Sequence, residues 1–211
     1  MTESLRRWLG GVRLSPAVVA LLVADMIASC SVLAPRPDPS RFFVLAPLPQ
    51  APSPATGTRV SSLGVGPIVL PRYLDRPEIV TRVGPNEVKP AVFDYWAGSL
   101  SNQFQSVLAQ NLQTLVHPDR VQMYPWYSGT APELVAEVDV QRFEPSSDGR
   151  AELVARWRVR KGSALGTLRA GESTLTRPLS GSDADAVAQA LSGLLDDFSR
   201  ELAEAILAAR A

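Results

Sequence analysis

Alternating apolar and polar residues predict two adjacent β-strands in the second half of the chain. Apolar residues alternate with acidic ones over 134–140 (LVAEVDV) and with arginines over 153–160 (LVARWRVR). Turn-forming residues around Gly149 lie between the two segments, which predicts a β-hairpin. If Val138 is opposite Trp157, the acidic residues of one strand face the arginines of the other, and these pairs stabilise the hairpin.

A spacing of three or four residues between apolar positions predicts two long amphipathic helices. The first has Asp94 as its N-cap and ends at Pro118. The second has Ser182 as its N-cap and carries an apolar stripe as far as Ile206. Both N-cap residues have a side-chain oxygen that can accept a hydrogen bond from the first turn.

Shorter apolar runs predict the remaining strands, which lie at 41–45, 60–70, 78–82, 87–92 and 167–176. The run Gly64–Pro67 interrupts the second of them and predicts a bulge. It is not expected to bind phosphate, because Pro67 has no N–H group and strand residues follow it. The order of strands, helix, strands and helix predicts an α+β fold: a single domain with a mainly antiparallel sheet and two long amphipathic helices packed on it.

The N-terminal 29 residues are predicted to be a signal peptide. Arginines come first, the apolar run 17–24 (AVVALLVA) follows, and small residues precede Cys30. The apolar run is far shorter than the roughly 20 residues of a membrane-spanning helix. The segment Ile27–Cys30 resembles the bacterial lipobox, in which the cysteine thiol receives a lipid and the leader is cut just before it. We therefore predict that Cys30 is the lipidation site and carries acyl chains such as palmitate; the alternative is a secreted protein with an incidental cysteine.

Residues 30–40 are predicted to form a Pro-rich tether between the lipidated cysteine and a folded domain at 41–211. Pro35, Pro37 and Pro39 favour an extended chain. At about 3.1 Å per residue, the tether after Cys30 spans roughly 30 Å. The enterobacterial sorting pattern uses an Asp after the cysteine for retention in the inner membrane. Ser31 at this position favours the outer membrane.

The composition excludes several classes of function. The chain has 21 basic and 21 acidic residues and is 45% hydrophobic, which argues against a disordered chain and against an overall basic nucleic-acid-binding protein. A single cysteine and a single histidine, His117, exclude a disulfide framework and the common zinc motifs. We expect no metal, no cofactor and no nucleic-acid partner, and we expect that the protein is not an enzyme.

The run at 65–82 (VGPIVLPRYLDRPEIVTR) resembles the ABC-type transport auxiliary lipoprotein family. That family includes the lipoprotein of the paraquat-inducible (Pqi) system. Trp96 and the segments Asn111–Leu112 and Ala155–Trp157 fit the same pattern, and the likeness extends over about residues 41–209. The family accompanies transport systems that are built from a periplasmic MCE-domain (mammalian-cell-entry) protein and a membrane permease and that move lipids between the two membranes.

The resemblance implies a non-enzymatic lipoprotein on the periplasmic face of the outer membrane. It would anchor or dock the MCE assembly. A homo-oligomer of this chain is one arrangement that the resemblance suggests. An alternative function is a lipid carrier that binds acyl chains in a deep apolar cavity between sheet and helices. A periplasmic hydrolase is a more distant third, since no Gly-x-Ser-x-Gly motif is present.

Three residues of a proline-bounded loop, Tyr73, Leu74 and Arg76, are candidate contacts for the MCE partner or for a neighbouring subunit. Tyr and Arg are enriched among the residues that dominate binding energy in interfaces. The alternative is that Tyr73 and Leu74 cover the domain core while Arg76 pairs with an acidic residue.

Replacing the predicted lipid attachment site tests the anchor. We expect Cys30→Ala to leave the domain folded and to release it from membranes, because the acyl chains are the predicted source of membrane affinity. Sedimentation of envelopes after a wash at high salt and high pH measures the bound fraction. A variant that still sediments after this wash contradicts the prediction.

Overall fold

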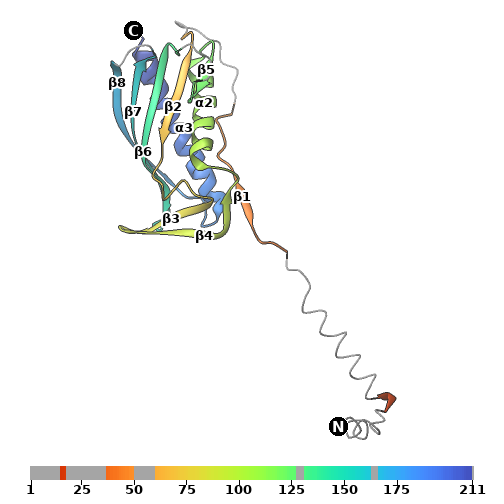
Figure 1. Ribbon diagram of the computed structural model, residues 1–211. Helices are drawn as coiled ribbons and strands as arrows, with labels where there is room; N and C mark the ends of the chain where they lie inside the picture. The colour runs from red at the N-terminus through yellow and green to blue at the C-terminus, as the bar shows by residue number, and fades with distance from the viewer. Residues whose placement is uncertain (1–14, 18–36, 50–59, 127–130, 163–165, 211) are drawn as a thin grey trace, which may run out of the picture. The chain divides into compact units, whose positions relative to one another are not determined.

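The computed structural model describes residues 15–17, 37–49, 60–126, 131–162 and 166–210 (Figure 1). The chain divides into two compact units, Met1–Pro39 and Ser40–Ala211. Cys30 and most of the predicted signal peptide and tether lie outside the described residues. Within the described residues, no helix has the length and apolar character needed to cross a bilayer.

The second unit is an α+β domain with one sheet and two long helices, as expected. Its elements, in chain order, are β1 (Arg41–Phe43), β2 (Leu63–Val69), β3 (Glu78–Gly84), β4 (Glu87–Trp96), α2 (Leu100–Val116), β5 (Val121–Met123), β6 (Leu134–Ser146), β7 (Arg150–Lys161), β8 (Thr167–Pro178) and α3 (Ala184–Ala208).

Strand β6 is the centre of the sheet. One of its edges pairs with β7 along almost its whole length, while the other edge is shared by β2 and by the end of β3. Val138 is opposite Trp157, as the alternation predicts, and the register shifts between Val140 and Arg142. Because β6 pairs with three strands, it connects the hairpin of β7 and β8 to the rest of the sheet.

The expectation of a mainly antiparallel sheet is wrong, because the sheet is mixed. Along the path β1-β4-β3-β6-β2-β5, every pairing except β3–β4 is parallel. The antiparallel pairs β6–β7 and β7–β8 extend the sheet on the other side of β6. Alternation in a sequence reveals a strand and its buried face but carries no information on strand direction. Helix α2 lies in the connection between β2 and its parallel partner β5, and parallel strands require such a crossover.

The predicted irregularity in β2 is confirmed. The pairing of β2 with β6 shifts register between Val65 and Ile68. Gly66 has a φ of 112°, a conformation that favours glycine. A Cβ atom at Gly66 would lie 2.9 Å from Nε2 of Gln105, which donates a hydrogen bond to the Val65 carbonyl. The glycine therefore lets α2 bind the irregular strand closely.

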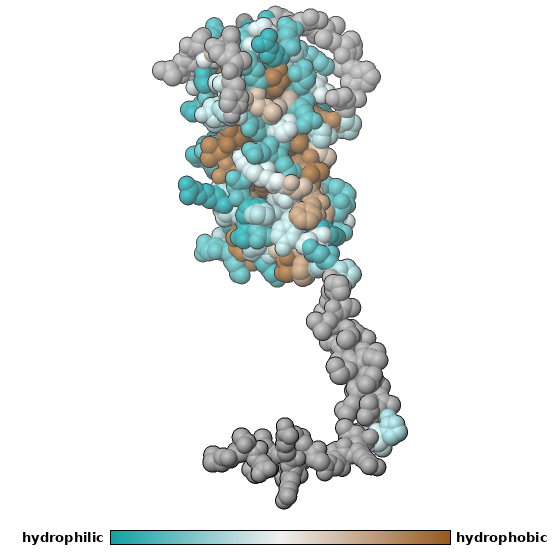
Figure 2. Space-filling model, turned by 45° about the vertical axis from the view of Figure 1, so that its right-hand side comes forward, coloured by the Kyte–Doolittle hydropathy of each residue, from teal (hydrophilic) through white to brown (hydrophobic). Residues whose placement is uncertain are grey.

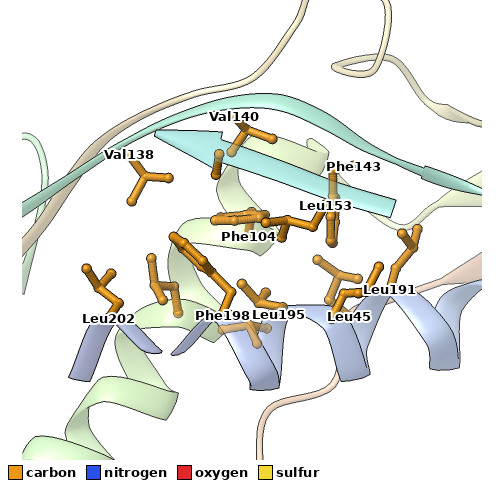
Figure 3. Close-up of a cluster of buried hydrophobic side chains, with 14 of the residues drawn as sticks. Leu45, Phe104, Val138, Val140, Phe143, Leu153, Leu191, Leu195, Phe198 and Leu202 are labelled. Carbon is orange, nitrogen blue, oxygen red and sulfur yellow. The ribbon is translucent and has the colours of Figure 1, made fainter. Parts of the chain in front are cut away.

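The core lies between the sheet and the two helices (Figure 3). Phe104 of α2 packs edge-to-face on Phe143 of β6, with ring centroids 5.1 Å apart, and lies 6.3 Å from the ring of Phe198 of α3. All three rings are fully buried. The lipid-carrier hypothesis requires an apolar cavity between the sheet and the helices, and these three rings fill part of that space.

Both predicted helix starts are wrong by a few residues. Asp94 lies in β4 and pairs with Arg41, so the N-cap of α2 is Ser99, whose Oγ accepts from the Asn102 amide. The N-cap of α3 is Asp183 instead of its neighbour Ser182. The β1–β4 pairing holds Asp94 in a strand, and tertiary contacts of this kind override local capping preference.

Residues 45–48, which we call the strap, follow β1 and bridge the two helices. Their backbone N–H groups donate to side chains of α2 and α3, over 2.8–3.0 Å: from Leu45 to Gln103, from Ala46 to Ser192 and from Leu48 to Asn111. The remaining residue, Pro47, has no N–H group to satisfy. Every backbone donor of the strap therefore has a partner, and the helices fix its course.

Asn111 is the residue whose loss tests the strap. It is fully buried, and its amide nitrogen also donates to Asp196 and Ser199 of α3. We expect Asn111→Ala to lower the free energy of unfolding by about 2–3 kcal/mol, because buried polar partners lose their hydrogen bonds. Urea unfolding followed by circular dichroism measures the change. The control, Gln110→Ala on the exposed side of the same helix, is expected to change stability by less than about 0.5 kcal/mol; equal losses in the two variants contradict the prediction.

Candidate functional site

The proline-bounded loop that connects β2 to β3 is tied to the domain at several points. The amides of Leu74 and Asp75 donate to the Pro71 carbonyl, which closes a turn. Leu74 is only 2% exposed and belongs to the hydrophobic core. Arg76 is exposed and pairs with Glu78 over 2.8 Å. Of the three candidate contact residues, Arg76 is therefore the one whose side chain a partner can reach fully.

Tyr73 and Arg82, which both lie in the 65–82 run, bind the same buried carboxylate. Glu144 of β6 is 2% exposed and accepts from the Tyr73 hydroxyl over 2.8 Å and from Nε of Arg82 over 2.6 Å. Arg82 also donates to the Tyr73 hydroxyl oxygen, at 3.1 Å. A buried carboxylate needs such partners, so this network holds the loop against the sheet.

The network shifts the pKa of two of its members. Burial, followed by the hydrogen bond to Glu144, raises the pKa of Tyr73 from 10.0 to about 12. Burial lowers the pKa of Arg82, but its bonds to Glu144 and to Tyr73 outweigh burial, so that pKa lies above its ordinary value. At neutral pH Tyr73 is therefore a neutral donor and Arg82 a cation, which is the arrangement that a buried carboxylate requires.

A groove lies between this loop and the junction of β4 with α2. It has a volume of about 430 Å³ and is lined by Phe42, by residues 75–77 of the loop and by residues 96–99. Asp75 accepts hydrogen bonds from the Ser99 hydroxyl and from the Ser101 amide, so the start of α2 already holds a carboxylate. The groove therefore presents an arginine and apolar side chains beside an occupied helix terminus.

The arginines of β7 do not form a free cationic surface. Arg158 and Arg160 both pair with Glu137 of β6, and Arg156 pairs with Glu172 of β8. A hollow of about 670 Å³ lies beside these pairs. Glu137 and Arg158 therefore pair across the facing strands as the sequence predicts. Arg156 faces Asp139 as predicted but forms its ion pair with Glu172 of β8.

The only histidine of the sequence lies at the end of a helix. His117 is the C-cap of α2 and adopts the left-handed conformation, with a φ of 51°. The described residues contain no group of three side chains that could hold a metal ion. The sequence analysis missed Glu144, Arg82 and Phe42. Only Arg82 had a signal, since it ends the motif; nothing in the sequence marks Glu144 as the partner of two motif residues.

Comparison with known proteins identifies one family. The sequence model of a family described as ABC-type transport auxiliary lipoprotein component matches residues 43–203, which is more than half of the chain. None of the curated proteins matches this chain significantly.

Solved structures share the fold. A protein of Xanthomonas campestris from the DUF330 family is 20% identical, with 81% of this chain and 97% of that chain covered and a TM-score of 0.68. An uncharacterized protein is 18% identical, with coverages of 78% and 97% and a TM-score of 0.63. The PelC dodecamer of Paraburkholderia phytofirmans is 14% identical, with coverages of 71% and 93%, and its TM-score of 0.41 is too low to bear on function.

The buried network makes a pH-dependent prediction. Because the folded pKa of Tyr73 lies above its unfolded value of 10.0, its stabilising contribution is fully present below pH 10 and is lost as the pH rises towards about 12. We expect the advantage of the wild type over Tyr73→Phe in unfolding free energy to be constant at neutral pH and to shrink above pH 10. Urea titrations of both proteins across this range measure it; a constant difference throughout contradicts the assignment.

Proposed function

The chain belongs to the family of ABC-type transport auxiliary lipoprotein components, and we propose that it docks the periplasmic MCE assembly of a lipid-transport system at the outer membrane. Family membership implies a lipid-anchored, non-catalytic component that is associated with an ABC-type transport system. The match over residues 43–203 is the observation that carries the proposal. The proposal adds two specific elements to family membership, the outer membrane as the location and the MCE assembly as the partner, and the experiment below tests the partner.

Anchoring follows from Cys30 and from the way the chain enters the domain. Lipid on this cysteine holds the protein at the bilayer, and residues 31–40 are the chain between the lipid and β1. The β1–β4 pairing and the strap fix everything from Arg41 to Leu48. The domain therefore stays within roughly 30–35 Å of its membrane, measured along an extended tether.

Docking is assigned to the groove and the loop beside it. Arg76 supplies an exposed guanidinium beside the groove's apolar lining. Tyr73 and Leu74 act as positioning residues, because one binds Glu144 and the other fills the core. This surface adjoins the strand where the tether enters, so a partner bound there is held close to the bilayer. Association of several copies into a homo-oligomer would repeat the surface around the partner.

Charge reversal of the exposed arginine tests the docking surface. We expect Arg76→Glu to reduce recovery of the MCE-domain protein severalfold in pull-downs from detergent-solubilised envelopes, because a negative charge replaces a positive one at the contact. The matched control is Arg156→Glu, since Arg156 is also an exposed arginine paired with a glutamate, Glu172.

Three results distinguish the parts of this proposal. Loss with Arg76→Glu but not with Arg156→Glu supports the docking surface. Equal recovery of the MCE-domain protein by the wild type and by both variants rejects this docking surface but not the MCE partner. Repeated recovery of no MCE-domain protein by the wild type rejects the docking function itself.

A further inference from the structure

Exposed hydrophobic side chains gather where the tether enters the domain. In the described part of the chain, nine large hydrophobic residues are exposed, and four of them lie on or directly beside the paired strands β1 and β4. We call these four the apolar patch: Phe42 (66% exposed), Val44, Val92 (66%) and Phe93 (49%). Figure 2, in which the side that carries β1 is turned further towards the viewer, shows hydrophobic residues at the surface among hydrophilic ones.

The apolar patch is built by the backbone and is not a set of loose side chains. Phe42 is opposite Tyr95 in the β1–β4 register, and the two rings stack with centroids 5.7 Å apart. The Tyr95 hydroxyl donates to the Val92 carbonyl over 2.9 Å. These contacts link β1 to the stretch of β4 that carries Val92 and Phe93.

The chain cannot bury these residues in its own core. Their neighbours Phe43 and Trp96 already pack on the core side of β1 and β4. The β3–β4 register jumps from Glu78 opposite Tyr95 to Val80 opposite Pro90, so the stretch with Val92 and Phe93 has no partner in β3. The residues are therefore held at the surface, where a gathered apolar group indicates a contact with another apolar phase.

We infer that the apolar patch rests on the surface of the lipid bilayer that holds the protein. This inference depends on the proposed anchor at Cys30. The length of the tether selects the bilayer as occupant: residues 31–40 extend roughly 30–35 Å at most, and β1 begins directly after them. The strap binds both helices, so no further chain can be released. Within the described residues, Phe42 and Val44 of the apolar patch are thus the exposed large hydrophobic residues nearest to Cys30 along the chain.

The chemistry around the apolar patch suits a membrane interface. Arg41 is more than half exposed, pairs with Asp94 and lies over the Phe43 ring. Arg72, in the loop that follows β2, is also exposed. Aromatic rings with apolar side chains enter the boundary between headgroups and acyl chains, while arginines remain among lipid phosphates. Contact of this kind adds to the lipid anchor and orients the domain.

Site-specific fluorescence in membranes tests the inference. The processed, lipidated chain is reconstituted in vesicles of phosphatidylethanolamine and phosphatidylglycerol. Because lipid occupies the only native cysteine thiol, a cysteine introduced by Phe42→Cys or Phe93→Cys is the sole free thiol and accepts an environment-sensitive fluorophore. The control is Leu207→Cys: Leu207 is 45% exposed in α3, at the end of the domain opposite β1 (Figure 1). Circular dichroism confirms that each variant is folded.

We expect the probes at 42 and 93 to shift to the blue in vesicles and to lose fluorescence when the lipids carry brominated acyl chains, while the probe at 207 does neither. Brominated-lipid quenching at 42 and 93 no greater than at 207 overturns the inference. Probes that are shielded from an aqueous quencher but not quenched by lipid also overturn it, because a second copy of the chain then covers the apolar patch. Flotation separates the two proposals: a chain that floats without quenching rejects the patch alone, and one that does not float rejects the anchor together with it.

Discussion

A polar group that is removed from water must find a partner inside the protein, and two such groups hold a loop and the segment after β1 in place on this domain. The Glu144 carboxylate binds Tyr73 and Arg82 and so holds the β2–β3 loop against the sheet. The Asn111 amide binds Leu48, Asp196 and Ser199 and so holds the strap to both helices. If either group lost its partners, the loop or the strap would lose part of its attachment to the core.

These attachments place several features at one end of the domain. The chain enters the domain at β1, and the groove with Arg76 lies between the β2–β3 loop and the start of α2. The apolar patch adjoins both through Phe42. The proposed docking function needs a membrane contact and a partner contact within reach of the predicted tether, and it needs no cavity inside the core. The packing of Phe104, Phe143 and Phe198 is consistent with that division of roles.

Local patterns predicted much of the fold correctly. The hairpin of β6 and β7, its register at Val138 and Trp157, and the bulge in β2 all follow from side-chain alternation and from glycine and proline. The candidate site was predicted in part: the loop was found from its motif, but Leu74 is a core residue and Arg76 is the exposed member. Phe42 could not be distinguished in the sequence from Phe43, which packs on the core, because which of two adjacent strand residues is covered depends on the rest of the sheet.

The sequence by itself determined the two amphipathic helices and the family motif, and it predicts the leader with its cysteine, since each is a property of neighbouring residues. Only the tertiary structure decided that the sheet is mixed, that Asp94 lies in a strand, that Glu144 is the shared partner of Tyr73 and Arg82, and that the apolar patch stays uncovered. Each of these depends on contacts between segments far apart in the chain. Alternation and capping preferences act over a few residues and carry no information about which distant segment will arrive beside them.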